Sequence, residues 1–73
     1  MTSDELFESL GFEMEVYEDR ISFKKGKIFI NYIFKPNQIH TNILQDMDLY
    51  QNEDLREAMK SKYQELFKST LIL

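Results

Sequence analysis

The stretch that decides the fold is residues 27–34, KIFINYIF, the longest strongly β-prone run in the chain. Side chains of a strand alternate between its two faces, so this run has one largely apolar face. That face carries Ile28, Ile30, Tyr32 and Phe34. The opposite face carries Phe29 and Ile33. We therefore predict a central strand with one face in the core and a second face whose apolar residues are the best indication of function.

Three breaks of hairpin length divide residues 13–43 into four β-prone runs, 13–17, 20–24, 27–34 and 39–43. Two-residue loops at 18–19, 25–26 and 36–37 would pair Val16 with Ile21, Phe23 with Ile28, and Phe34 with Ile39. All three registers place the apolar residues on the same face. Its members are Met14, Val16, Ile21, Phe23, Ile28, Ile30, Tyr32, Phe34, Ile39, Thr41 and Ile43. The sequence thus predicts a four-stranded antiparallel meander.

A short helix precedes this sheet. Thr2 can cap it with Glu5 as the reciprocal partner of a capping box. Gly11 suits the left-handed residue that ends such a helix, and Phe12 can then pack back on Phe7. We expect a sharp turn from the helix into the first strand.

A longer helix follows the sheet, with Asn52 as its N-cap. Apolar residues recur along it at spacings of three and four, interrupted by a lysine stem. The stripe is Leu55, Ala58, Met59, Lys62, Tyr63, Leu66, Phe67 and Thr70.

Residues 1–73 are therefore expected to form one α+β domain, a two-layer α-β-β-β-β-α sandwich with both helices on one face of the sheet. The acidic connection 44–51 should cover one edge of the core with Leu44, Met47 and Leu49, and the apolar end, Leu71–Leu73, should dock on the sheet, the first helix or a second subunit.

Composition narrows the class of protein. With 42% hydrophobic residues, no cysteine and one histidine, the chain is typical of a folded domain without disulfides or a common zinc framework. No run approaches the ~20 apolar residues of a membrane-spanning helix, and the beginning is acidic, unlike a signal peptide. We expect a cytoplasmic protein that does not contact a membrane.

The face of the sheet opposite the core, which we call the open face, should be mostly polar. The registers assign to it Glu13, Glu15, Tyr17, Arg20, Ser22, Lys24, Lys27, Phe29, Asn31, Ile33, Lys35, Gln38, His40 and Asn42. Scattered apolar residues on a surface are normal, so a simply solvated face is one interpretation. The other is contact with a protein partner or a second copy through Tyr17, Phe29, Ile33 and His40.

Charge segregation leaves two further hypotheses. Residues 1–19 hold seven acids and no base, whereas residues 20–35 hold five bases and no acid. Arg20, Lys24, Lys25 and Lys27 could contact nucleic acid, although the net charge of −4 disfavours this. Alternatively, the chain could be an inhibitor that presents acids such as Glu13, Glu15, Asp46 and Asp48 to a nucleic-acid-binding host or defence enzyme. Neighbouring acidic and basic strands that neutralise each other are the simpler interpretation.

No catalytic motif stands out. Asp46, Asp48, Asn52, Asp54 and Glu57 match part of a calcium-loop template, but Gln51 occupies the place that needs glycine. His40 has no cysteine to activate and no evident orienting acid, and Ser22 lies two strands away. With only Gly11 and Gly26, a glycine-rich phosphate loop is excluded. We expect a protein that is not an enzyme, with no metal, cofactor or small-molecule substrate.

The order of motifs carries a resemblance. ELFESLGFE, a strand, the ISFKKG hairpin, an isoleucine- and phenylalanine-rich strand, a polar strand and the helix EDLREAMKSKYQEL together resemble small uncharacterised phage and prophage proteins of Gram-positive bacteria. LFESLGF is the most specific part. The resemblance implies an accessory or host-interaction role and carries over no functional residues.

Overall fold

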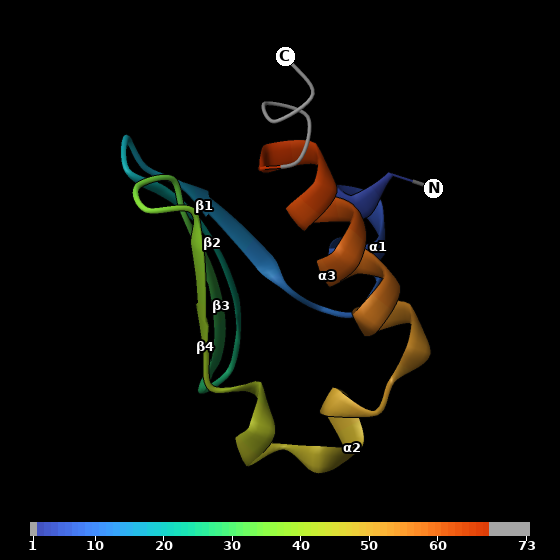
Figure 1. Cartoon of the computed structure of the whole chain (residues 1–73). Coiled ribbons are helices and arrows are strands. Elements are labelled where there is room, and N and C mark those ends of the chain that lie inside the picture. Colours follow the sequence, from blue (N-terminus) through green and yellow to red (C-terminus); the bar gives the residue numbers. More distant parts are fainter. Residues whose placement is uncertain (1, 68–73) are drawn as a thin grey trace.

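The computed structural model describes residues 2–67 and places two helices on one side of a four-stranded sheet (Figure 1). The elements, in chain order, are α1 (Ser3–Ser9), β1 (Glu13–Val16), β2 (Arg20–Lys25), β3 (Ile28–Ile33), β4 (Gln38–Thr41), the 3-10 turn η1 (Ile43–Gln45), α2 (Met47–Tyr50) and α3 (Glu53–Leu66). The strands are antiparallel and adjacent in the order β1-β2-β3-β4. This confirms the predicted α+β class and the meander.

Helix α1 begins and ends as its sequence predicts. The Thr2 side chain accepts a hydrogen bond from the backbone N–H of Glu5, and the Glu5 carboxylate accepts one from the N–H of Thr2. At the other end Gly11 has φ +90, and the N–H of Phe12 donates to the carbonyl of Phe7 at 3.0 Å. The rings of Phe7 and Phe12 then meet edge to face, 5.7 Å between centroids. This turn directs the chain from α1 into β1.

The predicted register is correct for the first hairpin and wrong by two residues for the other two. Val16 pairs with Ile21, but Phe23 pairs with Ile30 and Tyr32 with Ile39. Lys25 stays in β2, so the second loop is Gly26-Lys27, with Gly26 at φ 59 in the first loop position.

The third loop spans residues 34–37. The N–H of Phe34 donates to the carbonyl of Asp19, the residue before β2, so Phe34 is bonded on the β2 side of β3 and does not pair with β4. A shift of two residues preserves side-chain alternation. Every strand therefore keeps its predicted faces.

The core is built from aromatic rings contributed by the helices and the central strands. Phe23 of β2 stacks on Phe7 of α1 at 3.9 Å and meets Tyr32 of β3 edge to face at 6.0 Å. The ring of Tyr32 is 6.2 Å from that of Phe67, and its hydroxyl donates to the carbonyl of Met59 at 3.0 Å. These rings fix the distance and orientation of the helices over β2 and β3.

The helix layer stops short of the edge strand β1. Met14 and Val16 belong to the helix-facing side, as predicted, but they are 48% and 67% exposed and do not join the core. Thr41 at the end of β4 is also exposed. The two helices are too few to cover all four strands, so only β2 and β3 among the strands contribute buried side chains.

The segment after β4 differs from the prediction in detail. Strand β4 ends at Thr41, and the buried Ile43 reaches the core from η1 instead of continuing the strand. Leu49 packs against the core, whereas Leu44 and Met47, which were predicted to do so, are exposed. The connection therefore covers the core through one of its three apolar residues.

Helix α3 is capped by Asn52 and packs its predicted stripe on the core: Leu55, Ala58, Lys62 and Phe67 are buried and Met59, Tyr63 and Leu66 are partly buried, whereas Thr70 lies outside the described residues. The Lys62 ammonium lies 2.7 Å from Asp4 and 3.3 Å from Glu65, so it ties α3 to α1. Both carboxylates remain about half exposed, which keeps them solvated. The predicted docking of Leu71–Leu73 lies outside the described residues, and no helix within residues 2–67 is long and apolar enough to span a membrane.

Candidate functional site

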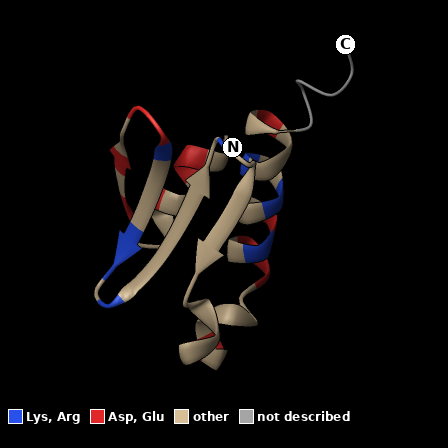
Figure 2. Cartoon of the chain, turned by 60° about the vertical axis from the view of Figure 1, so that its left-hand side comes forward, with Lys and Arg blue, Asp and Glu red and all other residues tan. Residues whose placement is uncertain are grey.

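The open face of the sheet consists of three rows of side chains that cross the strands. Pairing between strands defines these rows, because directly opposite residues point to the same face. The middle row is Glu15, Ser22, Asn31 and His40. The Tyr17 row is Tyr17, Arg20, Ile33 and Gln38, and the Phe29 row is Glu13, Lys24, Phe29 and Asn42. No helix among the described residues covers this face, which is turned toward the viewer in Figure 2.

Acidic and basic side chains neutralise each other along β1 and β2. The Lys24 ammonium lies 3.0 Å from Glu15, and Arg20 lies 3.0 Å from Asp19 and over the ring of Tyr17 at 4.2 Å. A hydrogen bond from the Tyr17 hydroxyl, followed by the Lys24 ammonium, lowers the pKa of the Glu15 carboxyl. The same contacts raise the pKa of Tyr17 and of Lys24. The acidic edge strand therefore forms a charge-paired unit with its basic neighbour (Figure 2).

Ser22 is the unusual residue of the open face. It is 1% exposed, and its hydroxyl has no hydrogen-bond partner among the described residues. It belongs to the wall of a hollow of about 230 Å³ whose lining residues are Tyr17, Arg20, Ser22, Lys24, Phe29 and Asn31. A buried polar group without a partner costs about 1–3 kcal/mol, so native proteins seldom retain one without a reason. This residue marks a place where a polar group from outside would be stabilising.

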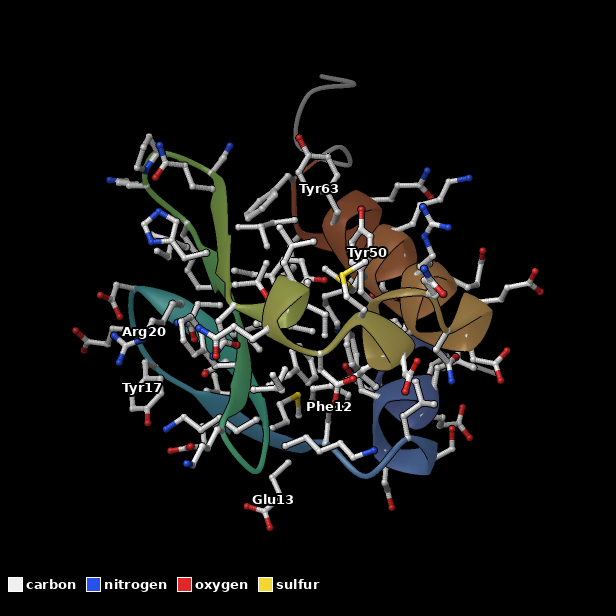
Figure 3. All side chains as sticks on the ribbon, turned by 90° about the horizontal axis from the view of Figure 1, so that it is seen from below. Phe12, Glu13, Tyr17, Arg20, Tyr50 and Tyr63 are labelled. Atoms are coloured by element: carbon white, nitrogen blue, oxygen red, sulfur yellow. The ribbon has the colours of Figure 1, made fainter. Side chains whose placement is uncertain are left out.

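The four residues predicted to bind a partner all lie on the open face but do not form one cluster. Phe29 and Ile33 are partly buried, and each lies two residues from Asn31, on opposite sides of it along β3. Tyr17, 38% exposed, follows β1 at one edge of the sheet, and Figure 3 shows it on the side away from the helices. His40 is exposed on β4 at the other edge, with Nε2 3.0 Å from Gln38 Oε1. A partner that touched all four would span the full width of the sheet.

The four basic residues of the nucleic-acid hypothesis do not share one surface. Arg20 and Lys24 point to the open face and are paired with acids. Lys25 points to the opposite face, where its ammonium lies 6.0 Å from the ring centroid of Phe12. Lys27 is in the β2–β3 turn. The arrangement therefore lacks the continuous unpaired basic track that follows a phosphate backbone.

Two polar residues in and beside the acidic connection serve as N-caps of helices. Asp46 accepts a hydrogen bond from the N–H of Leu49 and caps α2, and Asn52 caps α3. The calcium-loop template is therefore divided between two helix starts. Among residues 2–67, no group of three or more histidines or acids is arranged to hold a metal ion. Glu15 is held by Lys24 on a different element, so the acids of the inhibitor hypothesis do not act as one group.

The sequence identified the open face and its apolar residues, but the importance of Ser22 and Asn31 was missed. Alternation places both on this face, yet burial and lack of a partner depend on the side chains around them. A larger hollow of about 650 Å³ lies between the β2–β3 turn and α2, where Lys25 and Lys27 face Asp46 and Asp48. It contains no comparable buried, unpartnered polar side chain among the described residues.

Comparisons of the chain with protein-family models, curated proteins and solved structures give no match. The geometry of the open face is therefore the basis for inferring function.

Proposed function

We propose that this chain is a non-catalytic interaction protein that binds a protein partner through the open face of its sheet. The observation that carries this proposal is the buried Ser22 hydroxyl, which lacks a partner in the middle of a face that no described helix covers. Phe29 and Ile33 lie beside it on the central strand and supply apolar area to bury. An interface with a small apolar centre and a polar rim has this composition.

A binding role is favoured over catalysis by the spacing of the polar groups. His40 and Ser22 share the middle row, but the strand that carries Asn31 lies between them. Adjacent strands are about 4.8 Å apart, so the two residues are separated by roughly 10 Å. A general base must come within about 2.6–3.2 Å of the group that it deprotonates. The polar residues of this face are better suited to hydrogen-bond a partner.

A protein partner is favoured over nucleic acid because Arg20 and Lys24, the bases within the three rows of the open face, are already paired with acids. A phosphate backbone that followed β2 would also run beside Glu13 and Glu15 of β1. The resemblance to small phage and prophage proteins also favours a protein partner, since it implies an accessory or host-interaction role.

The test compares two charge-balanced double variants. Phe29→Glu with Ile33→Lys alters the open face, and Glu57→Lys with Lys60→Glu alters exposed residues on α3. Each variant is first shown to be folded by circular dichroism and thermal unfolding. It is then used beside the wild type as bait to retain partner proteins, and light scattering measures self-association. We expect the open-face variant to lose association that the wild type and the α3 variant retain. Equal association of all three chains would exclude the open face as the binding surface.

A further inference from the structure

The middle row of the open face has an order that allows it to pair with itself. Across the four strands it reads carboxylate, hydroxyl, amide and imidazole: Glu15, Ser22, Asn31, His40. Reversing the row places the hydroxyl opposite the amide and the carboxylate opposite the imidazole. Each opposed pair combines a hydrogen-bond acceptor with a donor.

A twofold axis performs this reversal if it runs parallel to the strands over the seam between β2 and β3. It would place Ser22 of one copy over Asn31 of the other, twice, and so supply a partner for the buried hydroxyl. It would also place Glu15 over His40 at both edges. Such an isologous contact repeats every interaction, as closed dimers require.

The two outer rows are compatible with the same axis. Lys24 would face Phe29, and Arg20 would face Ile33, so that the long basic side chains cover the apolar residues of the other copy. Packed sheets are rotated by about 30° because each is twisted, which displaces outer rows more than central ones. The middle row is therefore the part of the contact that stays in register.

Other symmetric arrangements are less favourable. An axis perpendicular to the strands over the middle row would lay β1 over β1 and oppose Glu15 to its own copy. A parallel axis over β2 would oppose Ser22 to Ser22 and leave β4 outside the contact, and one over β3 would oppose Asn31 to Asn31 and leave β1 outside. Among these parallel axes, the one over the β2–β3 seam joins all four strands and places a carboxylate opposite an imidazole at both edges.

We infer that the partner of the open face is a second copy of this chain, related by a twofold axis over the β2–β3 seam, with Ser22 bonded to Asn31 of the other copy. A second copy fits better than a uniformly acidic or basic partner, since the face presents both charge signs side by side. The inference rests on the proposed function, because it names the occupant of the same face. Fewer residues line this face than the 20–30 a side of a standard interface, so the dimer should be weak and concentration-dependent.

The test uses single-cysteine chains, because the natural sequence contains no cysteine. Ser22→Cys and Asn31→Cys chains are mixed under mild oxidation, with Lys60→Cys on the exposed surface of α3 as the matched control. Separate chains are needed because positions 22 and 31 are direct neighbours within one chain. Packed sheets accept disulfides between them, as immunoglobulin sandwiches do. We expect several-fold more 22–31 mixed disulfide than 22–22, 31–31 or 60–60 disulfide.

A charge exchange tests the edges without cysteine. Glu15→Lys and His40→Glu should each weaken self-association in sedimentation equilibrium, and the double variant should recover it, because a lysine then lies opposite a glutamate at each edge. If either substitution acted only by disturbing the fold, the other would not restore self-association. Sedimentation runs from about 10 µM to about 1 mM, the range in which weak contacts of small area dissociate.

The outcomes separate this inference from the proposed function. A wild type that stays monomeric over the whole range, or disulfides dominated by like pairs, would overturn the twofold contact. If that monomer still retains a different protein, and Phe29→Glu with Ile33→Lys abolishes retention, the second copy is wrong but the binding face stands. If neither the chain itself nor another protein binds the open face, both proposals fall.

Discussion

Ser22 and Phe23 are neighbours in β2 and equally buried, each 1% exposed, yet they have opposite surroundings. Phe23 points to the helices and packs between the rings of Phe7 and Tyr32. Ser22 points to the open face, where its hydroxyl meets no partner among the described residues. The difference teaches that equal burial can reflect completed packing on one face of a sheet and an incomplete contact on the other. Stability and binding should therefore respond to different faces.

The largest expected effect is on the free energy of unfolding, when a phenylalanine is truncated to alanine on one face of the sheet or on the other. Phe23→Ala should destabilise the fold by about 3–5 kcal/mol, since it leaves a cavity between stacked rings. Phe29→Ala should cost less, about 1–2 kcal/mol, since Phe29 is only partly buried. Urea unfolding monitored by circular dichroism measures both. Equal losses would mean that the open face is packed as completely as the helix face.

A smaller effect concerns the hydrogen bond that the Tyr32 hydroxyl makes in the aromatic core. Tyr32→Phe removes the hydroxyl that donates to Met59 and should cost about 0.5–1.5 kcal/mol at neutral pH. Burial raises the pKa of Tyr32, so the folded state keeps its proton after the unfolded chain, with a pKa near 10, has lost it. This stabilisation is complete below about pH 10 and declines as the pH rises further.

The Tyr32→Phe chain lacks that titration, so the stability gap between it and the wild type should narrow above about pH 10. Urea unfolding at about pH 8 and about pH 10.5 gives the two gaps, and the other tyrosines cancel in the difference. A gap that stayed constant or widened with pH would contradict the burial of this hydroxyl.

The smallest effect has the opposite sign. Ser22→Ala removes a buried hydroxyl that has no partner in the single chain, so monomer stability should stay equal or rise by up to about 1 kcal/mol. The same substitution should weaken self-association, because Asn31 of the other copy then loses its partner. Denaturation at low concentration and sedimentation at high concentration measure the two effects. A clear loss of monomer stability would show that the hydroxyl already serves the single chain.

Side-chain alternation explains why the faces of the sheet could be predicted although two registers could not. The second and third loops were placed wrongly, but each error moved the pairing by two residues, and only an odd shift exchanges the faces. The loops depended on details that local patterns do not contain. Lys25 stays in its strand beside Phe12, and Phe34 stays paired with Asp19 instead of β4.

Burial at the edges was predicted less well than the faces themselves. Val16 has the same alternation as Ile30, yet one is 67% exposed and the other 0%. Alternation assigns a face, whereas burial requires another element above it, and the helices lie over β2 and β3. Lys62 shows the converse, since a lysine within the apolar stripe is buried because Asp4 of α1 comes within 2.7 Å of it.

The sequence by itself determined the element order, the caps of α1 and α3, the faces of the strands and the apolar pair Phe29 and Ile33 on the open face. These features follow from short-range spacing and capping chemistry, which act within a few residues. The tertiary structure alone decided the registers, the exposure of β1, and the burial of Ser22 without a partner. Those properties depend on which side chains from distant parts of the sequence come into contact. These contacts form only when the sheet and helices pack together.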